Sequence, residues 1–478
     1  MTERTLSVGD RRIDERTRTR PGLVLTILVT CQLMLILDVT VMNVALPRIQ
    51  ADLHFTPTGL SWVIDAYTLV FGGLLLLGGR AGDLFGRRRL FIAGIAVFTL
   101  GSLAGGFATS SGWLLAARVV QGVGAAAAGP NTLALIITTF TEPTRRIRAL
   151  AVFSGMSSGG FAIGLMLGGV LTELTSWRSV LFINVPVGIA IVLLASRFLA
   201  TPARHPGRLD LPGAVTGTVG VGALVYGFIR AGSVGWGDRI TMGAIVLGLV
   251  VLAVFLAIEV RTRQPVMPLR LFANRDRAAA YLNFFLGPMA MMSMFFFLTQ
   301  FLQEIRGLSP VGTGFAFLPM AALLFGMTRL IPRLLPRFGP KPLALTGTAL
   351  MAGGLVWLTQ ITADSGYLTG LLGPLALMGI GGGLAFAPLN VVIMATVGPA
   401  DAGAAGGVLQ TLQNLGATVG LAVLVTVFGT ASRHAASNGA VPRIALVSGM
   451  TSAWSVAVVF AVATFLVALT FRRQRAAT

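Results

Sequence analysis

Residues 22–46 read GLVLTILVTCQLMLILDVTVMNVAL, and Asp38 is the single charged side chain in this stretch. An α-helix needs about 20 apolar residues to cross the ~30 Å hydrocarbon layer of a bilayer. The stretch therefore predicts a membrane-spanning helix. Because a charge in the bilayer interior is costly, the acid inside it is a candidate functional residue.

Apolar stretches of the same kind follow along the whole chain of 478 residues. Together with the first they lie at residues 22–46, 59–79, 90–109, 113–138, 149–172, 180–200, 211–230, 240–260, 278–302, 312–332, 342–362, 367–396, 403–430 and 447–471. With 55% hydrophobic and 11% charged residues, the chain is too apolar for a soluble protein. We expect an all-α polytopic membrane protein with fourteen transmembrane helices in the lipid bilayer.

The net charge of +19 would favour nucleic-acid binding if it were spread over one face. Its distribution along the chain favours membrane topology instead, because most Lys and Arg fall in the two tails and in every second loop. The remaining loops hold only seven: Arg48, Arg178, Arg230, Arg239, Arg306, Arg433 and Arg443. By the positive-inside rule we expect both termini to be cytoplasmic and the protein to lie in the cell (inner) membrane. We expect no nucleic-acid partner.

Two sequence patterns recur between the first and second halves of the chain. The pattern of residues 84–90 is repeated at 337–343. Gly124 lies six residues before Pro130, and Gly382 lies six residues before Pro388. Duplicated halves of this kind are common in transporters, with the substrate site at their interface. The predicted units are a cytoplasmic tail at 1–21, a six-helix bundle at 22–200, a linker with two extra transmembrane helices at 201–277, a second six-helix bundle at 278–471 and a cytoplasmic tail at 472–478.

The sequence offers no residues for ATP hydrolysis, metal binding or catalysis. The only lysine, Lys341, lies between two prolines and not in a P-loop. Cys31 is the only cysteine, and His54, His205 and His434 all lie between the apolar stretches. We expect no enzyme activity, no metal and no cofactor, and transport would draw on an ion gradient or on the gradient of the substrate.

Three ionisable residues lie inside predicted spans. Asp38 is deep in the first, Asp65 lies about two turns into the second, and Arg118 lies at a similar depth in the fourth. A buried carboxylate near an arginine can load and release a proton, because burial raises its pKa while the positive charge of the arginine lowers it. We predict that these residues couple transport to protons. The alternative is a static cluster that neutralises itself and holds three helices together.

Several motifs resemble the major facilitator superfamily in its fourteen-helix drug:proton antiporter branch, over about residues 25–470. Residues 37–47 are similar to the first-helix signature of that branch, and residues 79–89 to the loop motif between helices two and three. The fourth-helix motif is matched by Arg118, Gln121, Gly122 and Gly124, the entry to helix six by residues 176–178 and 182–186, and helices nine and ten by Gln300, Gly307, Ser309, Pro310, Gly314 and Pro319.

The resemblance implies a cytoplasmic gate in the loop motif. The gating residues would be Gly79, Asp83, Gly86, Arg87 and Arg88. Asp83 can pair with a basic group and approach a helix N-terminus, which favours negative charge. In the family such a latch holds the outward-open state. The alternative is that the arginines only anchor the loop on the cytoplasmic side.

The fifth-helix antiporter motif is matched with one departure. Its helix-packing glycines are present as Gly160, Gly164, Gly168 and Gly169, but Leu165 stands where the family has a proline. A proline there would bend the helix and free a carbonyl. Its loss weakens the expectation of export, while the glycines still allow close packing.

We therefore expect an alternating-access exporter of drug-like, amphiphilic (antibiotic-type) molecules in exchange for protons, acting as a monomer. Its partners would be small-molecule substrates, protons and lipid. Apolar contacts would dominate the cavity, and Met and Phe residues at 289–297 would supply part of its wall or face lipid. Polar contacts are predicted from Asn43, Trp62, Tyr67, Gln121, Asn131, Gln300, Asn390 and Gln413. The alternatives are a metabolite permease that acts as importer or uniporter and, less favoured, a non-transporting membrane sensor.

Overall fold

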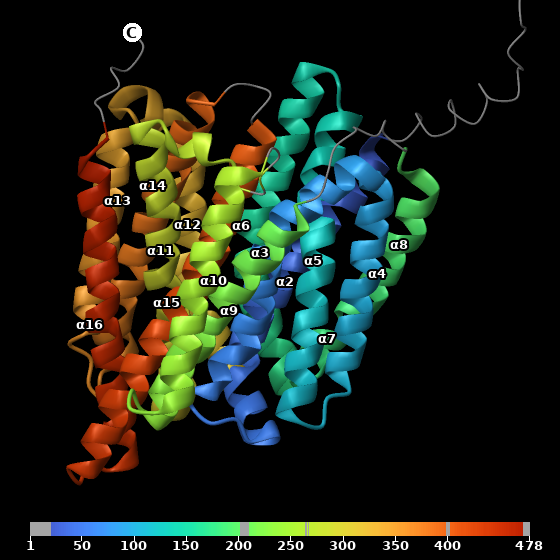
Figure 1. Ribbon diagram of the computed structural model, residues 1–478. Coiled ribbons are helices and arrows are strands. Elements are labelled where there is room, and N and C mark those ends of the chain that lie inside the picture. The colour runs from blue at the N-terminus through green and yellow to red at the C-terminus, as the bar shows by residue number, and fades with distance from the viewer. Residues whose placement is uncertain (1–20, 201–209, 263–264, 266, 398–401, 472–478) are drawn as a thin grey trace, which may run out of the picture.

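A computed structural model describes residues 21–200, 210–262, 265, 267–397 and 402–471, and within them the chain is a bundle of long helices (Figure 1). The two tails beyond Pro21 and Phe471 lie outside the described residues. The first half holds α2 (Pro21–Leu53), α3 (Trp62–Phe85), α4 (Arg87–Gly106), α5 (Ser111–Thr139), α6 (Pro143–Leu174), α7 (Ser179–Phe182) and α8 (Asn184–Phe198). Then follow α9 (Leu211–Val234), α10 (Arg239–Arg261), α11 (Arg275–Gln300), α12 (Pro310–Phe338), α13 (Pro340–Leu358), α14 (Leu372–Ala395), α15 (Ala402–Ser437) and α16 (Pro442–Leu469).

The predicted apolar stretches lie on these helices, with 180–200 divided between α7 and α8, but not all of the helices meet the requirements of a membrane span. Twelve helical segments in the described residues are long and apolar enough to cross a bilayer. The two predicted spans outside this set are α6, which contributes only the shorter apolar helix Gly159–Leu174, and α13, which has 19 residues and begins beside Lys341. The structure thus confirms a helical, multi-pass membrane protein.

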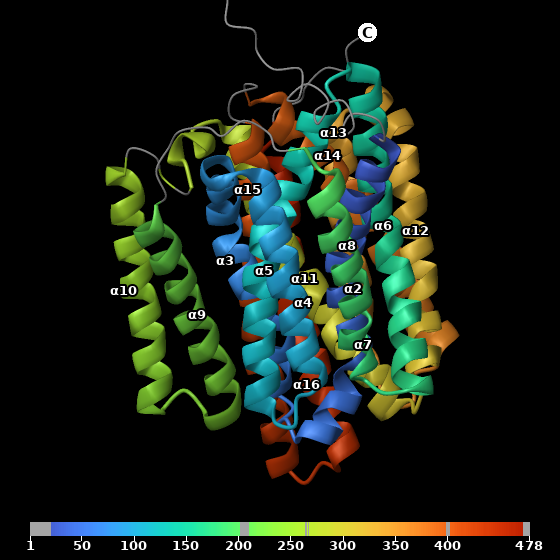
Figure 2. The same cartoon turned by 90° about the vertical axis from the view of Figure 1, so that its right-hand side faces the viewer.

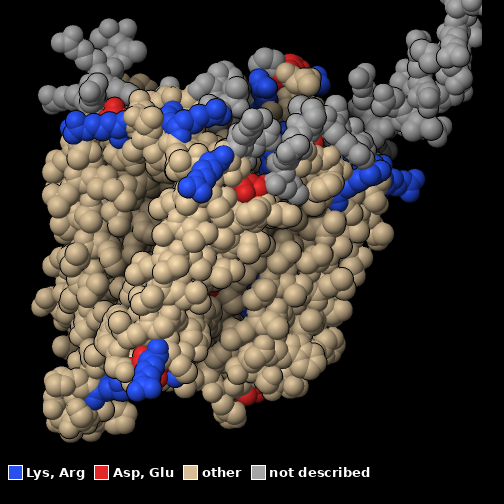
Figure 3. Space-filling view, viewed as in Figure 1, with Lys and Arg blue, Asp and Glu red and all other residues tan. Residues whose placement is uncertain are grey.

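The surface has the charge distribution of such a protein. Figure 3 shows Lys and Arg near the two ends of the bundle and a broad uncharged belt between them. Large apolar side chains are exposed in this belt, for example Leu193 and Val250. The first described turn of α2 and the last turn of α16 lie at the same end of the bundle (Figure 1). The junction of α3 and α4 lies at this end too, whereas the turn between α15 and α16 lies at the opposite end (Figure 1). We therefore name the two ends the α3–α4 end and the α15–α16 end.

Glycine allows the helices to approach closely. A Cβ atom built on Gly124 of α5 would lie 2.4 Å from the backbone nitrogen of Phe98 in α4. One built on Gly347 of α13 would lie 2.5 Å from the backbone nitrogen of Ala385 in α14. Any larger residue at either position would push the helices apart. The abundance of glycine therefore has a packing function here, as is common in membrane helices.

Helices α9 and α10 form a hairpin at the edge of the bundle, and Figure 2 shows α10 on its outer side. Helix α9 packs against the body, on α3 and α15, whereas α10 packs mainly on α9. The loop of the hairpin is held by Asp238, which accepts hydrogen bonds from Nε of Arg230 at 2.7 Å and from the backbone N–H of Thr241 at 2.9 Å. These bonds lower the pKa of the Asp238 carboxyl to about 2.

Candidate functional site

The ion pair between Asp38 and Arg118 is the centre of the candidate site. Helix α2 supplies Asp38 and α5 supplies Arg118, and Nη1 of Arg118 lies 2.5 Å from Oδ2 of Asp38. Both side chains are buried, with 1% and 0% of their surface exposed. A buried pair of this kind is tolerated only where further hydrogen bonds satisfy the remaining polar atoms.

Three neutral side chains provide most of those hydrogen bonds, while Nη2 of Arg118 has no partner among the described residues. Gln121, one turn after Arg118, accepts from Arg118 at 3.0 Å and donates to Oδ1 of Asp38 at 2.9 Å. Asn184, at the start of α8, donates to the same oxygen at 2.9 Å. Ser102 of α4 accepts from Gln121 at 2.7 Å. The Asp38 carboxylate thus receives three donors, and its network joins α2, α4, α5 and α8.

Tyr67 connects this network to a cavity. The guanidinium carbon of Arg118 lies 4.5 Å from the centre of the Tyr67 ring, a cation–π arrangement. The Nε atom of Arg118 also donates to the backbone carbonyl of Val63 at 2.9 Å. Val63 lies on α3, the helix that carries Tyr67. Tyr67 lines the cavity, whereas Asp38 lies behind the cavity wall. Movement of the Tyr67 side chain would therefore act directly on the Asp38–Arg118 ion pair.

Asp65 lies apart from the network, although the sequence placed it at a similar depth. Its side chain is fully buried, and Ser61, four residues earlier, brings a hydroxyl near the carboxylate, but neither oxygen accepts a hydrogen bond of normal geometry from the described residues. Its neighbours along α3, Trp62 and Leu69, pack with apolar residues of α9 and α15. Asp38 and Arg118 are therefore brought together, and Asp65 is not.

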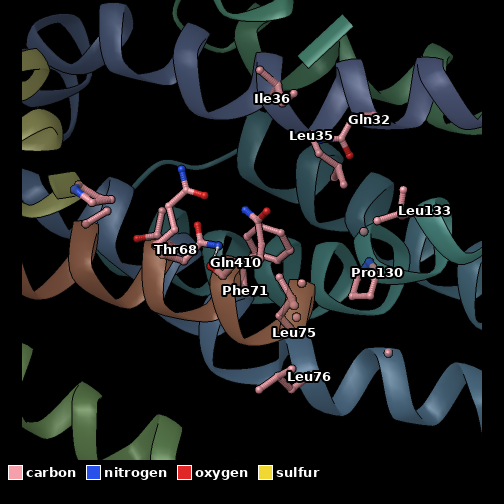
Figure 4. A pocket seen from close by; sticks show the side chains of 18 of the residues that line it. Gln32, Leu35, Ile36, Thr68, Phe71, Leu75, Leu76, Pro130, Leu133 and Gln410 are labelled. Atoms are coloured by element: carbon pink, nitrogen blue, oxygen red, sulfur yellow. Dashed lines mark hydrogen bonds between the residues drawn. The ribbon is translucent and has the colours of Figure 1, made fainter. Parts of the chain in front are cut away.

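The cavity has a volume of about 1640 Å³ and is lined by both halves of the chain. Figure 4 shows Gln32, Leu35 and Ile36 of α2 on one side, with Thr68, Phe71 and Leu75 of α3 and Gln410 of α15 facing them. Its apolar wall includes Phe161, Met291, Met292, Phe295 and Phe386. Of the predicted Met and Phe run, only part lines the cavity, because Phe296 and Phe297 are buried in the helix packing.

The predicted polar contacts of the cavity divide into two groups. Tyr67, Asn131 and Gln413 line it. The other five lie outside its lining: Gln121 is in the ion-pair network, Asn43 accepts from Thr299, Trp62 lies against Tyr226, Gln300 donates to the carbonyl of Phe296, and Asn390 is exposed. Helix rotation decides this division, and the residue types alone do not encode it.

The cavity reaches the α3–α4 end of the bundle, where Arg80, Asp83 and Arg87 belong to its lining. The α15–α16 end is closed by contacts between the two halves. Thr299 of α11 donates to Asn43 of α2 at 2.7 Å, and Gln303 donates to the carbonyl of Val44 at 2.9 Å. Glu173 of α6 accepts from the backbone N–H of Val311 in α12 at 2.9 Å. The conformation is thus open at one end only.

The predicted gate is a short turn between two helices and not an extended loop. Helix α3 continues to Phe85 and α4 begins at Arg87, so Gly86 alone connects them, with φ of 105°. Only glycine adopts this conformation readily. Across the junction Arg87 pairs with Asp83 at 2.9 Å, and Arg88 donates to the carbonyl of Ser196. A Cβ on Gly79 would lie 3.4 Å from Pro130.

The glycines of the fifth-helix motif lie where α6 crosses α2 and α12. A Cβ on Gly164 would lie 1.8 Å from Oγ1 of Thr40, and one on Gly168 would lie 2.8 Å from Cα of Val41. Gly160 is close to Leu33, and Gly169 faces the carbonyl of Pro310 in α12. The backbone carbonyl of the motif's Leu165 faces Gly314 of α12, so the site of the missing proline is a contact between the two halves.

Sequence reasoning missed two members of the network. Asn184 was part of a quoted motif but was not predicted as a site residue, although a buried amide in an apolar span was a usable signal. Ser102 carried no such signal, since a small hydroxyl is common in membrane helices. The lining residues Gln32 and Thr68 were also not predicted.

Comparison with known proteins agrees with this architecture. Residues 28–421 match the family model described as Major Facilitator Superfamily. The puromycin resistance protein pur8 of Streptomyces alboniger is 43% identical over 448 residues, which cover 92% of this chain and 88% of that protein. The cephamycin export protein CmcT of Amycolatopsis lactamdurans is 43% identical over 406 residues, 84% of each chain.

Solved structures show the same fold at low sequence identity. An inward-facing, occupied bacterial homolog of the human lysosomal transporter Spinster has a TM-score of 0.63 and 18% identity, covering 93% of this chain and 95% of that one. An auto-inhibited POT family peptide transporter has a TM-score of 0.67 and 16% identity, covering 94% and 98%. On its sequence match, its fold and its relatives, this chain belongs to the Major Facilitator Superfamily of membrane transporters.

Proposed function

We propose that this protein is a secondary active exporter of antibiotic-type molecules, driven by protons that enter in exchange. The observation that carries the proposal is the buried Asp38–Arg118 pair, which contacts the wall of a large apolar cavity through Tyr67. The names of the relatives, puromycin resistance and cephamycin export, support antibiotics as the substrate class.

In this mechanism Asp38 holds the coupling proton. In the conformation open at the α3–α4 end its carboxylate accepts from Arg118, Gln121 and Asn184. Protonation removes the negative charge that these donors stabilise, so the network between α2, α5 and α8 weakens. A substrate that displaces Tyr67 moves the ring that lies against Arg118. Proton and substrate thereby act on the same helix contacts, so the binding of one can change the affinity for the other.

The α3–α4 end would be cytoplasmic and the Asp83 junction its gate. We propose that α6 and α13 cross the membrane together with the twelve helices that meet the span criterion, which makes fourteen spans, with both tails cytoplasmic. The six-helix units would be 22–200 and 278–471, joined by 201–277, in a monomer in the cell membrane. Coupling would require no cofactor besides the proton gradient.

Thiol labelling tests this topology. In a Cys31→Ser background, a cysteine at exposed Ser437 would react with an impermeant reagent in intact cells, whereas a cysteine at exposed Arg89 would react only after lysis. Labelling of position 437 only after lysis would contradict the fourteen-span arrangement.

The coupling proposal is tested with Asp38→Asn, which keeps the shape of the side chain and removes its titration. In proteoliposomes with an imposed proton gradient, we expect loss of uphill puromycin transport, while downhill exchange remains. The matched control is Asp364→Asn in an exposed turn, which should transport like wild type.

Thermal unfolding in detergent would show that both variants are folded. Wild-type proton-driven transport by the folded Asp38→Asn protein would refute the role of Asp38. Uptake in place of efflux by the wild type would favour an importer.

A further inference from the structure

The charged residues of the cavity lining lie at its mouth. Among the described lining residues, the charged ones are Arg80, Asp83, Arg87, Asp210 and Arg270. Each lies near a helix terminus at the α3–α4 end: the end of α3, the start of α4, the N-cap of α9 or the segment just before α11. Deeper in the cavity, the described lining residues carry no formal charge.

The deep part of the cavity is polar but neutral. Gln410, Gln413 and Asn414 of α15 line it, and their spacing places them on one face of the helix. We name these three residues the amide face. Figure 4 shows Gln410 beside Thr68 and Phe71 of α3, with Gln32 on the facing side of the pocket. Side-chain amides offer both donors and acceptors, so this surface suits hydrogen-bonding groups on a ligand.

Neither buried acid serves as a counter-ion for a ligand in this conformation. Asp38 and Asp65 are 1% and 0% exposed and do not belong to the lining. The charge of Asp38 is also already matched by Arg118. A permanent cation in the deep cavity would therefore have aromatic rings and neutral amides as partners but no carboxylate, and these partners compensate less of its lost hydration than an ion pair does.

We propose that the deep cavity selects uncharged amphiphiles that carry amide or hydroxyl groups on an aromatic or apolar body, and discriminates against permanent cations. The amide face binds the polar groups, and Phe71, Phe295 and Phe386 bind the apolar body. An ionisable drug enters this site in its neutral form. This selectivity rests on the proposed function, since it names the substrate class of the same cavity.

Equilibrium binding to the purified full-length protein tests the selectivity without any proton gradient. The probes are radiolabelled chloramphenicol, which is neutral and has an amide, two hydroxyls and an aromatic ring, and radiolabelled tetraphenylphosphonium, which is a permanent cation. We expect chloramphenicol to bind about tenfold more tightly than tetraphenylphosphonium, and Gln413→Leu to weaken chloramphenicol binding about tenfold.

A charge-introducing variant provides the sharper test. Gln413→Glu places a carboxylate on the amide face and should improve tetraphenylphosphonium binding about tenfold. Gln410→Glu replaces it in the experiment if Gln413→Glu folds poorly, and the same improvement is expected. The matched control is Gln360→Glu, in an exposed turn just beyond the end of α13, which should leave both affinities unchanged.

Equal or tighter tetraphenylphosphonium binding by the wild type, no chloramphenicol binding, or no gain in a folded glutamate variant would overturn the selectivity. None of these results concerns coupling, because proton-driven transport of another substrate through Asp38 would still stand. Conversely, the expected affinities together with proton-independent transport would retain the selectivity and refute the exporter mechanism.

Discussion

Asp38 and Asp65 are acids at similar predicted depths in neighbouring spans, but their surroundings differ. Asp38 receives donors from Arg118, Gln121 and Asn184, whereas Asp65 receives none from the described residues. The helix face explains the difference, because Asp38 points toward α5 and α8 while the neighbours of Asp65 pack toward α9 and α15. Depth in the membrane therefore identifies candidate acids, and the partner helix decides which of them takes part in an ion pair.

The largest loss of stability is expected from replacing Arg118, the cation that pairs with Asp38. Arg118→Met leaves a buried carboxylate without its counter-ion and should lower the free energy of unfolding by about 3–5 kcal/mol. Replacing both partners, as in Asp38→Leu with Arg118→Met, should restore much of this loss, because apolar residues often replace a buried pair at little cost. Thermal unfolding in detergent measures both effects.

Arg145→Met is the matched control for that prediction, since Arg145 is 68% exposed and pairs with Glu142 at the surface. Its effect should stay within about 0.5 kcal/mol. If Arg118→Met were as mild as this control, the Asp38 network would not be a stabilising unit, and its contrast with Asp65 would disappear.

A smaller effect is expected from a neutral member of the network. Asn184→Ala removes the donor to Asp38 and should destabilise the protein by about 1–3 kcal/mol, because a buried acceptor loses a partner. Asn438→Ala, in the exposed turn before α16, is the control and should be nearly neutral. The comparison of unfolding midpoints is decisive: identical values would mean that Asn184 does not support the carboxylate.

The smallest effect is expected at Asp65. Asp65→Asn removes no ion pair and no hydrogen bond of normal geometry among the described residues, so the unfolding midpoint should be unchanged or raised. Proton-driven transport should fall less than in Asp38→Asn. A transport loss equal to that of Asp38→Asn would move the coupling role to Asp65, and a large drop in stability would reveal a partner in another conformation of the cycle.

Much of the fold followed from hydropathy. The first apolar stretch, predicted at 22–46, lies on α2, and the eighth, predicted at 240–260, matches α10 within one residue at each end. The helices often extend beyond the apolar runs, as α3 does through Asp83 to Phe85, because polar residues at a membrane surface continue a helix without penalty. The Asp38–Arg118 pair was also predictable, since each is a charge that needs a partner.

Hydropathy and charge along the chain were enough to identify the membrane class, the positions of the helices and the residues that are too polar for their spans. Helix packing brings Asn184 to Asp38 across 146 residues and leaves Asp65 outside this network. It also places Gln413 in the cavity lining and buries Gln300. The physical reason is that hydropathy does not distinguish lipid from protein interior. Val250 on α10 is 54% exposed and Phe297 on α11 is fully buried, yet both are apolar. Helix rotation and crossing, set by close contacts such as Gly124 against Phe98, choose between these environments.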